Sequence, residues 1–289
     1  MGEVISLSEQ RPARARGRFR WHAPLAGWVG AGLVLFWAVI ALVGPYVAPY
    51  DAGEVVGPRL FAPMSAEHLL GTDYLGRDML SRILDGAYYT VTLALSATVL
   101  ACLFGTSLGI LTAIRGGWFD MAVSRVMDAL ISMPHLLFSL VVIAALGSSM
   151  PVLIGLLAVT YTPGSFRIAR SHALGINAMD FVQVARARGE GTGFILREEI
   201  LPNMVLPVLT DFGLRFVFVV LLLSGLSFLG LGIQPPRADW GSLVRENVEG
   251  IYETAPAVIV PALAIATLTI GVNLFIDNMP RRRRGAPRA

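Results

Sequence analysis

Apolar residues lie in long blocks along this chain, and polar residues collect between the blocks. A helix needs roughly 20 apolar residues to cross a bilayer core of about 30 Å. The pattern predicts spans at Pro24–Gly44, Tyr88–Ile114, Met121–Leu146, Pro151–Ile168, Val205–Leu231 and Pro256–Ile276. We therefore predict an all-α polytopic membrane protein with six transmembrane helices.

The first apolar block is compatible with a signal peptide or with an uncleaved helix. Its length at Pro24–Gly44 exceeds the apolar region of a signal peptide, roughly 7–15 residues, and no A-x-A cleavage site follows it. The sequence favours an uncleaved helix. The proline-rich segment 45–85 is predicted to lie outside the membrane and to end in a short amphipathic helix near Asp78–Ala87.

The polar segments divide the chain. Gly147–Pro151 is a tight connection, Arg167–Asn203 is a long hydrophilic segment, and Ile233–Thr254 is a second polar loop. We predict a basic tail, a first helix with its extramembrane segment, a five-helix core that contains a loop at 176–203, and a second basic tail, at 1–23, 24–87, 88–280 and 281–289.

Arginine placement predicts the orientation, because arginines near span ends stay on the cytoplasmic side. The N-terminal tail, the C-terminal tail and Arg167–Asn203 carry five arginines each, whereas Ile233–Thr254 has mixed charge. We therefore expect both tails and Arg167–Asn203 to be cytoplasmic. Basic tails can also bind nucleic acid, but beside apolar spans they set topology, so no nucleic-acid partner is expected.

Composition supports a membrane protein and excludes several chemistries. Hydrophobic residues make up 55% and charged residues 15%, whereas about a quarter of a soluble domain is charged. Every basic residue except histidine is arginine, so a P-loop or Schiff-base lysine is excluded. Cys102 is the only cysteine and the four histidines are scattered. We expect no catalytic residue, metal site or bound cofactor in this chain.

Two charged pairs lie within or beside predicted spans. Arg125 and Asp128 are three positions apart, and Asp211 and Arg215 are four apart, so each pair shares a helix face. A charge within a span is a functional-site hypothesis by default. We place both pairs near the cytoplasmic ends of their spans, where pairing and snorkelling lower the cost, and favour structural pairing over substrate contact.

The cytoplasmic segment contains two predicted short helices separated by glycines. Ile176–Ala187 has helical periodicity, Gly189, Gly191 and Gly193 interrupt it, and Phe194–Ile200 is expected to end before Pro202. The first helix is too apolar to stay in water without a partner. The residues alone leave two alternatives open: docking to another protein, or lying at the lipid headgroup boundary.

The spacing in this segment resembles the EAA motif of bacterial ABC import permeases. Gln183-Val184-Ala185 stands in the Glu-Ala-Ala position, Gly189 follows its last alanine by four, and Ile200-Leu201-Pro202-Asn203 begins eleven positions later. Gln183 and Val184 depart from the motif, but its spacing is intact. The resemblance implies that Gln183, Val184, Ala185, Gly189, Ile200, Leu201, Pro202 and Asn203 form a loop that docks into a groove of the ATPase subunit.

Two further stretches narrow the resemblance. "HLLGTDYLGRDMLSRILDGA" at 68–87 and "SFLGLGIQPPRADWG" at 227–241 are similar to segments of the C-type permeases of the dipeptide, oligopeptide and nickel importers. The resemblance implies the transmembrane domain of a type I importer in the bacterial inner membrane. It also implies a sister permease, two ATPase subunits that bind ATP and magnesium, and an extracytoplasmic substrate-binding protein.

The function implied is ATP-driven import by alternating access, with peptides favoured as the solute. Nickel chelates, glutathione, opines and sugars are alternatives within the same subfamily. A secondary transporter would usually show an inverted repeat and midplane ionisable residues, and a membrane enzyme would need converging catalytic side chains. The sequence shows neither pattern.

Overall fold

The computed structural model describes residues 25–57, 59–252 and 256–279. Within these ranges the chain is helical, and strand pairing is limited to two isolated bridges. In chain order the elements are α1 Leu25–Val47, α2 Met79–Arg115, α3 Gly117–Ser132, α4 His135–Leu146, α5 Met150–Asn177, α6 Asp180–Ala187, α7 Thr192–Phe194, the π-helical turn η1 Ile195–Ile200, α8 Leu201–Phe228, α9 Trp240–Glu246, the 3₁₀ turn η2 Val248–Ile251 and α10 Pro256–Asp277.

Five helical rods are long and apolar enough to cross a membrane. They are α1, α2, α5, α10 and the continuous stretch Thr192–Phe228, which joins α7, η1 and α8. The pair α3 and α4 makes a sixth candidate with an angle of 90° between its helices. The all-α prediction is confirmed, and the described residues hold six candidate spans when the bent pair counts as one.

The predicted continuous span Met121–Leu146 is wrong, because the chain bends between α3 and α4. Met133 adopts an extended conformation, with φ −83° and ψ 130°, directly before Pro134. The proline ring disfavours helical backbone in the preceding residue, so the helix stops there and restarts at His135. The first half, α3, buries only Met127 among its 16 residues, so most of its surface remains free.

The prediction of a separate amphipathic helix at Asp78–Ala87 is also wrong, because these residues form the N-cap and the first turns of α2. Asp78 caps α2 by accepting hydrogen bonds from the Ser81 backbone N–H at 2.9 Å and the Ser81 hydroxyl at 2.8 Å. No proline follows the cap, so the helix continues for 37 residues, about 55 Å at 1.5 Å per residue. That length exceeds a bilayer core and carries α2 beyond the membrane.

The core forms around α2 and α5, which pack closely along their length. Gly105 of α2 lies so close to α5 that an added Cβ would come within 2.7 Å of the Thr162 carbonyl oxygen. Glycine here lets the two backbones approach, as is common between membrane helices. α5 also continues past the predicted end at Ile168 to Asn177, so Arg167 and Arg170 are helical rather than part of a loop.

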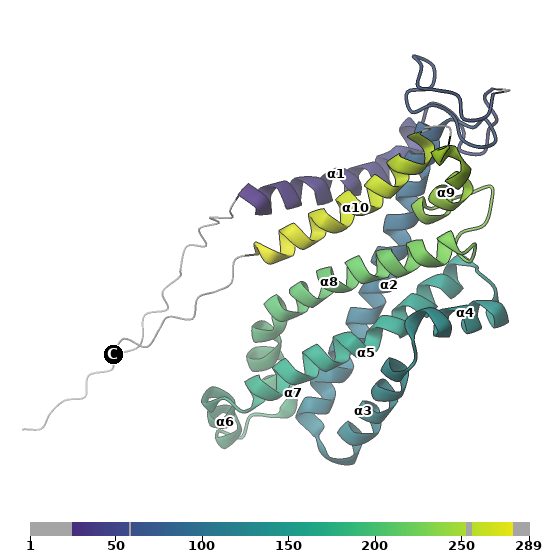
Figure 1. Ribbon diagram of the computed structural model, residues 1–289. Coiled ribbons are helices and arrows are strands. Elements are labelled where there is room, and N and C mark those ends of the chain that lie inside the picture. The colour runs from purple at the N-terminus through teal and green to yellow at the C-terminus, as the bar shows by residue number, and fades with distance from the viewer. Residues whose placement is uncertain (1–24, 58, 253–255, 280–289) are drawn as a thin grey trace, which may run out of the picture.

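The polar segments gather at opposite ends of the molecule (Figure 1). The segment between α1 and α2 lies with α9 at one end, and α6 with α7 lies at the other. α1 and α10 run side by side in opposite directions, so the start of α1 and the end of α10 are neighbours. The basic tails at 1–23 and 281–289 lie outside the described residues.

Candidate functional site

The loop at 176–203 is built from a short helix that a left-handed glycine terminates. The predicted helix Ile176–Ala187 is interrupted, since Met179 is extended and α6 begins at Asp180. At the other end Gly189 has φ +83°. Its N–H donates to the Arg186 carbonyl at 2.9 Å, and the Glu190 N–H donates to the Ala185 carbonyl at 3.2 Å. This pair of bonds is the Schellman arrangement, which favours glycine at the left-handed position.

One face of α6 is anchored in a small hydrophobic core. Val182 and Ala185 are buried against Ile195 and Ile200, which belong to η1. Residues of α2 and α5, including Ile110 and Ala173, complete the same cluster. The loop is therefore packed onto three membrane-spanning rods, so a displacement of α6 must disturb α2, α5 or α8.

The predicted site residues divide between this core and the surface. Ala185 and Ile200 are buried, with 6% and 0% of their surface exposed. The other six are exposed on the loop and the start of α8: Gln183, Val184, Gly189, Leu201, Pro202 and Asn203. Two of these side chains form hydrogen bonds with the nearby backbone. The Gln183 side-chain amide donates to the Asn177 carbonyl at 3.0 Å, and the Asn203 side-chain amide donates to the Glu199 carbonyl at 2.7 Å.

Pro202 does not end a helix, contrary to the prediction. The backbone widens into the π-helical turn Ile195–Ile200, and the Leu201 N–H donates to the Leu196 carbonyl five residues back. Pro202 then occupies the first turn of α8, where a backbone N–H has little need of a helical hydrogen bond, so its absence costs little. The wider π-helical turn also relieves the clash between the proline ring and the preceding carbonyls. The second short helix and the following span form one rod.

The outer surface of the loop carries apolar side chains that nothing in the described chain covers. Phe181, Val184, Phe194 and Leu201 are 38%, 49%, 44% and 42% exposed. Phe181 and Val184 lie on α6, outside the long spanning rods, and apolar exposure grouped there is typical of an interaction surface. This arrangement can bind a partner, and its attachment to the core can pass the partner's movement to the spans.

The pairing predicted for Arg125 and Asp128 differs in the structure. Asp128 accepts a hydrogen bond from Arg167 of α5 at 2.7 Å, not from Arg125. The bend after α3 turns this face towards α5, so a tertiary partner replaces the neighbour on the same helix. A second bridge joins the same helices, with Asp120 accepting from Arg170 at 2.6 Å.

The pairing of Asp211 with Arg215 is confirmed at 3.1 Å. Its predicted place near the end of the span is wrong, because α8 begins earlier than expected and the two residues are the eleventh and fifteenth of its 28. Asp211 is buried, with 3% of its surface exposed. A charged pair near the middle of a spanning helix is costly unless its members stay paired.

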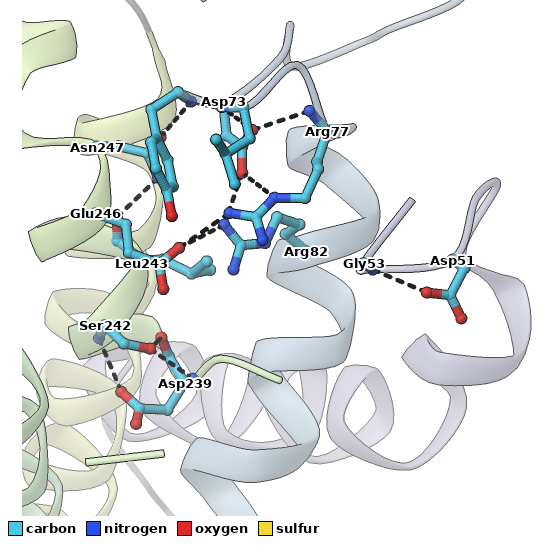
Figure 2. Close-up of polar contacts among 12 residues, drawn as sticks. Asp51, Gly53, Asp73, Arg77, Arg82, Asp239, Ser242, Leu243, Glu246 and Asn247 are labelled. Atoms are coloured by element: carbon cyan, nitrogen blue, oxygen red, sulfur yellow. Dashed lines mark hydrogen bonds and ion pairs between the residues drawn. The ribbon is translucent and has the colours of Figure 1, made fainter. Parts of the chain in front are cut away.

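The opposite end of the molecule holds an ion cluster that sequence reasoning missed (Figure 2). Asp73 accepts from Arg77 Nε at 2.7 Å and from Arg82 Nη1 at 2.7 Å. Glu246 of α9 accepts from the same two arginines at 3.1 and 2.8 Å. All four side chains are at most 6% exposed. The sequence pattern that could have predicted this cluster is in the stretch 68–87, where Asp73, Arg77 and Arg82 lie directly before an apolar span or at its start.

The start of α9 is fixed next to this cluster by further buried contacts. Asp239 forms a capping box with Ser242 and accepts a hydrogen bond from the Ser227 hydroxyl at 2.6 Å. Burial raises the pKa of the Asp239 carboxyl, and the hydrogen bond from Ser227 opposes this shift. Trp240 donates its ring N–H to the Ile83 carbonyl of α2 at 3.1 Å. The two motif stretches of the sequence thus contact each other in the fold.

Comparisons with known proteins match the chain over most of its length. The family described as "Binding-protein-dependent transport system inner membrane component" matches residues 105–285. A dipeptide transport system permease protein DppC from Alkalihalophilus pseudofirmus is 30% identical, with 87% of this chain and 83% of that protein covered. A glutathione transport system permease protein GsiD from Pectobacterium atrosepticum is 33% identical, over 87% and 84%.

A relative from Escherichia coli K12 and a solved structure extend the match. The probable D,D-dipeptide transport system permease protein DdpC is 30% identical over 95% of this chain and 96% of its own. The MetNI methionine ABC transporter in an inward-facing conformation is similar in fold, with a TM-score of 0.57 at 17% identity, covering 69% of this chain and 94% of that one. The chain belongs to the binding-protein-dependent transport system inner membrane component family.

Proposed function

We propose that this chain is a non-catalytic permease subunit that imports a peptide-like solute, and that the loop at 176–203 couples it to partner ATPases. The observation that carries the coupling role is the two-sided construction of α6. Val182 and Ala185 are packed into the core formed with α2, α5 and η1, whereas Phe181 and Val184 are exposed on the outside. A helix that only rested on lipid would not need the buried side.

The partners follow from this role. A sister permease completes the pathway, two ATPase subunits hold ATP and magnesium, and a binding protein delivers the solute. When the ATPase subunits move α6, the buried contacts of Ala185 and Ile200 transmit the displacement to α5 and α8. Alternating access then needs two packings a few kcal/mol apart, which the partners shift from one to the other.

We propose that the tails and the loop at 176–203 are cytoplasmic and that the ion cluster is extracytoplasmic. The arginine distribution supports this orientation, and so does the position of α6 at the end opposite α9 (Figure 1). In this orientation Asp73, Arg77, Arg82 and Glu246 lie on the side from which a binding protein approaches.

The substrate class rests on the relatives, whose names include dipeptides, D,D-dipeptides and glutathione. All three are peptides or peptide-like zwitterions. One face of α8 has two hollows that could line the route for such a solute. The inner hollow, about 520 Å³, includes Thr210 and Asp211, and the outer, about 510 Å³, includes Ser224 and Leu221.

The test is uptake by the whole assembly. Proteoliposomes that contain this chain, its sister permease, the ATPase subunits and the loaded binding protein are supplied with a labelled dipeptide. We expect accumulation that requires internal ATP and persists when ion gradients are collapsed by ionophores. Uptake that needs an ion gradient and ignores ATP would contradict the proposal and favour a secondary transporter. A screen of peptides and glutathione on the binding protein identifies the solute.

A further inference from the structure

The helix α3 is attached to the rest of the molecule by few packing contacts. Met127 is the one buried residue among its 16. Its apolar side chains are largely exposed, with Trp118 at 79%, Met121 at 63% and Val126 at 58%. Close packing is what fixes helices against one another in a membrane, so apolar contacts hold α3 only loosely. It lies towards the end of the molecule that holds α6 (Figure 1).

Both ends of α3 meet backbone that is not helical. At its start Gly116 and Gly117 both have φ +62°, a conformation that residues with a Cβ avoid. An added Cβ at either position would meet no atom within 4 Å, so these glycines serve the backbone and not close packing. At the other end Met133 is extended before Pro134. Hinges in proteins are a few such residues at the ends of elements, where changes in φ and ψ are absorbed.

Two ion pairs join α3 to α5 across this loosely packed boundary. Asp120 accepts hydrogen bonds from Arg170 Nε at 2.6 Å and from Arg170 Nη2 at 2.5 Å, the two-bond geometry that favours arginine. Asp128 accepts from Arg167 at 2.7 Å. The Arg170 and Arg167 side chains are 32% and 55% exposed. Exposed ion pairs add little to stability, so these two can be broken and formed again.

The two arginines lie on the part of α5 that leads into the loop at 176–203. Ala173, one turn after Arg170, belongs to the hydrophobic core beneath α6. This part of α5 is also fixed to α2, because a Cβ added to Gly109 would come within 2.8 Å of the Arg170 backbone nitrogen. The close contact between α2 and α5 leaves α3 as the element that is free to move.

We propose that α3 is a hinged helix, held against α5 by Arg167 and Arg170 in this conformation and released from it in the other conformation of the permease. Arg167 and Arg170 are then positioning residues, because they hold α3 and do not need to contact the solute. A helix that stayed fixed throughout transport would be expected to bury more than Met127. The proposal rests on the alternating access proposed above and names an element that moves.

Reversible crosslinking tests whether α3 must leave α5. Asp120→Cys and Arg170→Cys are combined with Cys102→Ala, and a short bis-methanethiosulfonate reagent joins the two cysteines in the assembled importer. We expect crosslinking to lower dipeptide uptake about tenfold or more, since a blocked conformational step limits turnover, and reduction to restore it. The control pair Arg170→Cys and Leu174→Cys lies on α5 alone, so its crosslinking should not change uptake. Unchanged uptake with the first pair, or an equal loss with both pairs, would overturn the proposal.

A distance measurement tests the release of α3 without relying on transport. Spin labels are attached at Met121→Cys and Leu174→Cys in the same background, where these side chains of α3 and α5 are 63% and 40% exposed. We expect one distance without nucleotide and an additional longer distance with a non-hydrolysable ATP analogue. Asp120→Asn with Asp128→Asn should give the longer distance without nucleotide, and exchange of the charges by Asp120→Arg with Arg170→Asp should restore the shorter one. A distribution that either the nucleotide or the two asparagines leave unchanged would overturn the proposal, whereas failure of uptake by the wild-type assembly would contradict the proposed function alone.

Discussion

Gly189→Val tests the coupling role of the loop most directly, because the structure isolates its effect to the backbone. Gly189 has φ +83°, and a Cβ added there would meet no atom within 4 Å. The substitution therefore creates no clash. It forces a β-branched residue into left-handed backbone, which costs on the order of 1–3 kcal/mol. That cost opposes the Schellman turn that ends α6.

The expected consequence is a shift in the position of α6. A free energy of about 1–3 kcal/mol changes an equilibrium roughly 5- to 150-fold. We expect the variant to reach the membrane in normal amount, because insertion depends on the spans. The purified complex should either lose its ATPase subunits or lose stimulation of hydrolysis by the loaded binding protein.

Matched variants make the result specific. Gly191 has φ −70° and ψ 160°, which valine adopts readily, and an added Cβ at Gly191 also meets nothing within 4 Å. Gly191→Val should behave as wild type. Gly189→Asn should be mild, since asparagine tolerates left-handed backbone better than other residues with a side chain. If Gly189→Val and Gly191→Val give equal co-purification and equal stimulated ATPase activity, the coupling role of Gly189 is refuted.

Four further results are expected. Glu246→Gln removes one charge from a buried cluster, which should cost about 3–5 kcal/mol and lower the Tm of the purified complex; an unchanged Tm would show that the cluster adds nothing. Ile200→Ala should cost about 2–5 kcal/mol in the core beneath α6, seen as faster hydrogen exchange in α6 but not in α10, and equal exchange in both helices would contradict it. Asp211→Asn should impair transport less than Gly189→Val, because its main contact is the pairing with Arg215; loss of transport with an intact complex and normal ATPase activity would instead show that Asp211 contacts the solute in the inner hollow. Cysteines at Ser8 and Glu249 should be labelled from opposite sides, and labelling of both from outside would exclude the six-span topology.

The spans could be predicted because their signal is local. A block of about 20 apolar residues is inserted as a helix wherever it lies in the chain, and each of the six predicted blocks contains at least one long helix in the structure, although the third is broken between Ser132 and His135. Gly189 was also predictable, since a left-handed turn after a helix needs glycine for local reasons. The positions at which a span is interrupted were harder to predict. Pro134 and Pro202 look alike in sequence, yet the chain bends by 90° at the first and continues through the second in a π-helical turn.

The pairing of Asp211 with Arg215 was predictable from its spacing, but two other charge partnerships were not, because they join distant elements. Arg125 and Asp128 are neighbours on one helix, but Asp128 binds Arg167, 39 positions away. In the same way Glu246 binds Arg82 across 164 positions. Spacing along a helix identifies only those possible charge partners that lie on the same face of that helix. Which candidate is chosen depends on the packing of α2, α3, α5 and α9, and a single sequence does not contain that information in local form.

The two polar ends of the molecule differ in how their structure is stabilised. At the end that holds α9, two acids and two arginines, Asp73, Glu246, Arg77 and Arg82, neutralise one another in burial, and removing one partner there is expensive. Such a cluster resists rearrangement and fixes the segment before α2 against α9. At the other end Phe181 and Val184 remain exposed over a small buried core. Exposed apolar area is stabilised only when a partner covers it, so the conformation of this end depends on the partner. With the orientation and coupling role that we propose, this asymmetry suits a chain that responds to ATP bound elsewhere: the rigid end at α9 receives the binding protein, and an ATPase completes the packing of the end at α6.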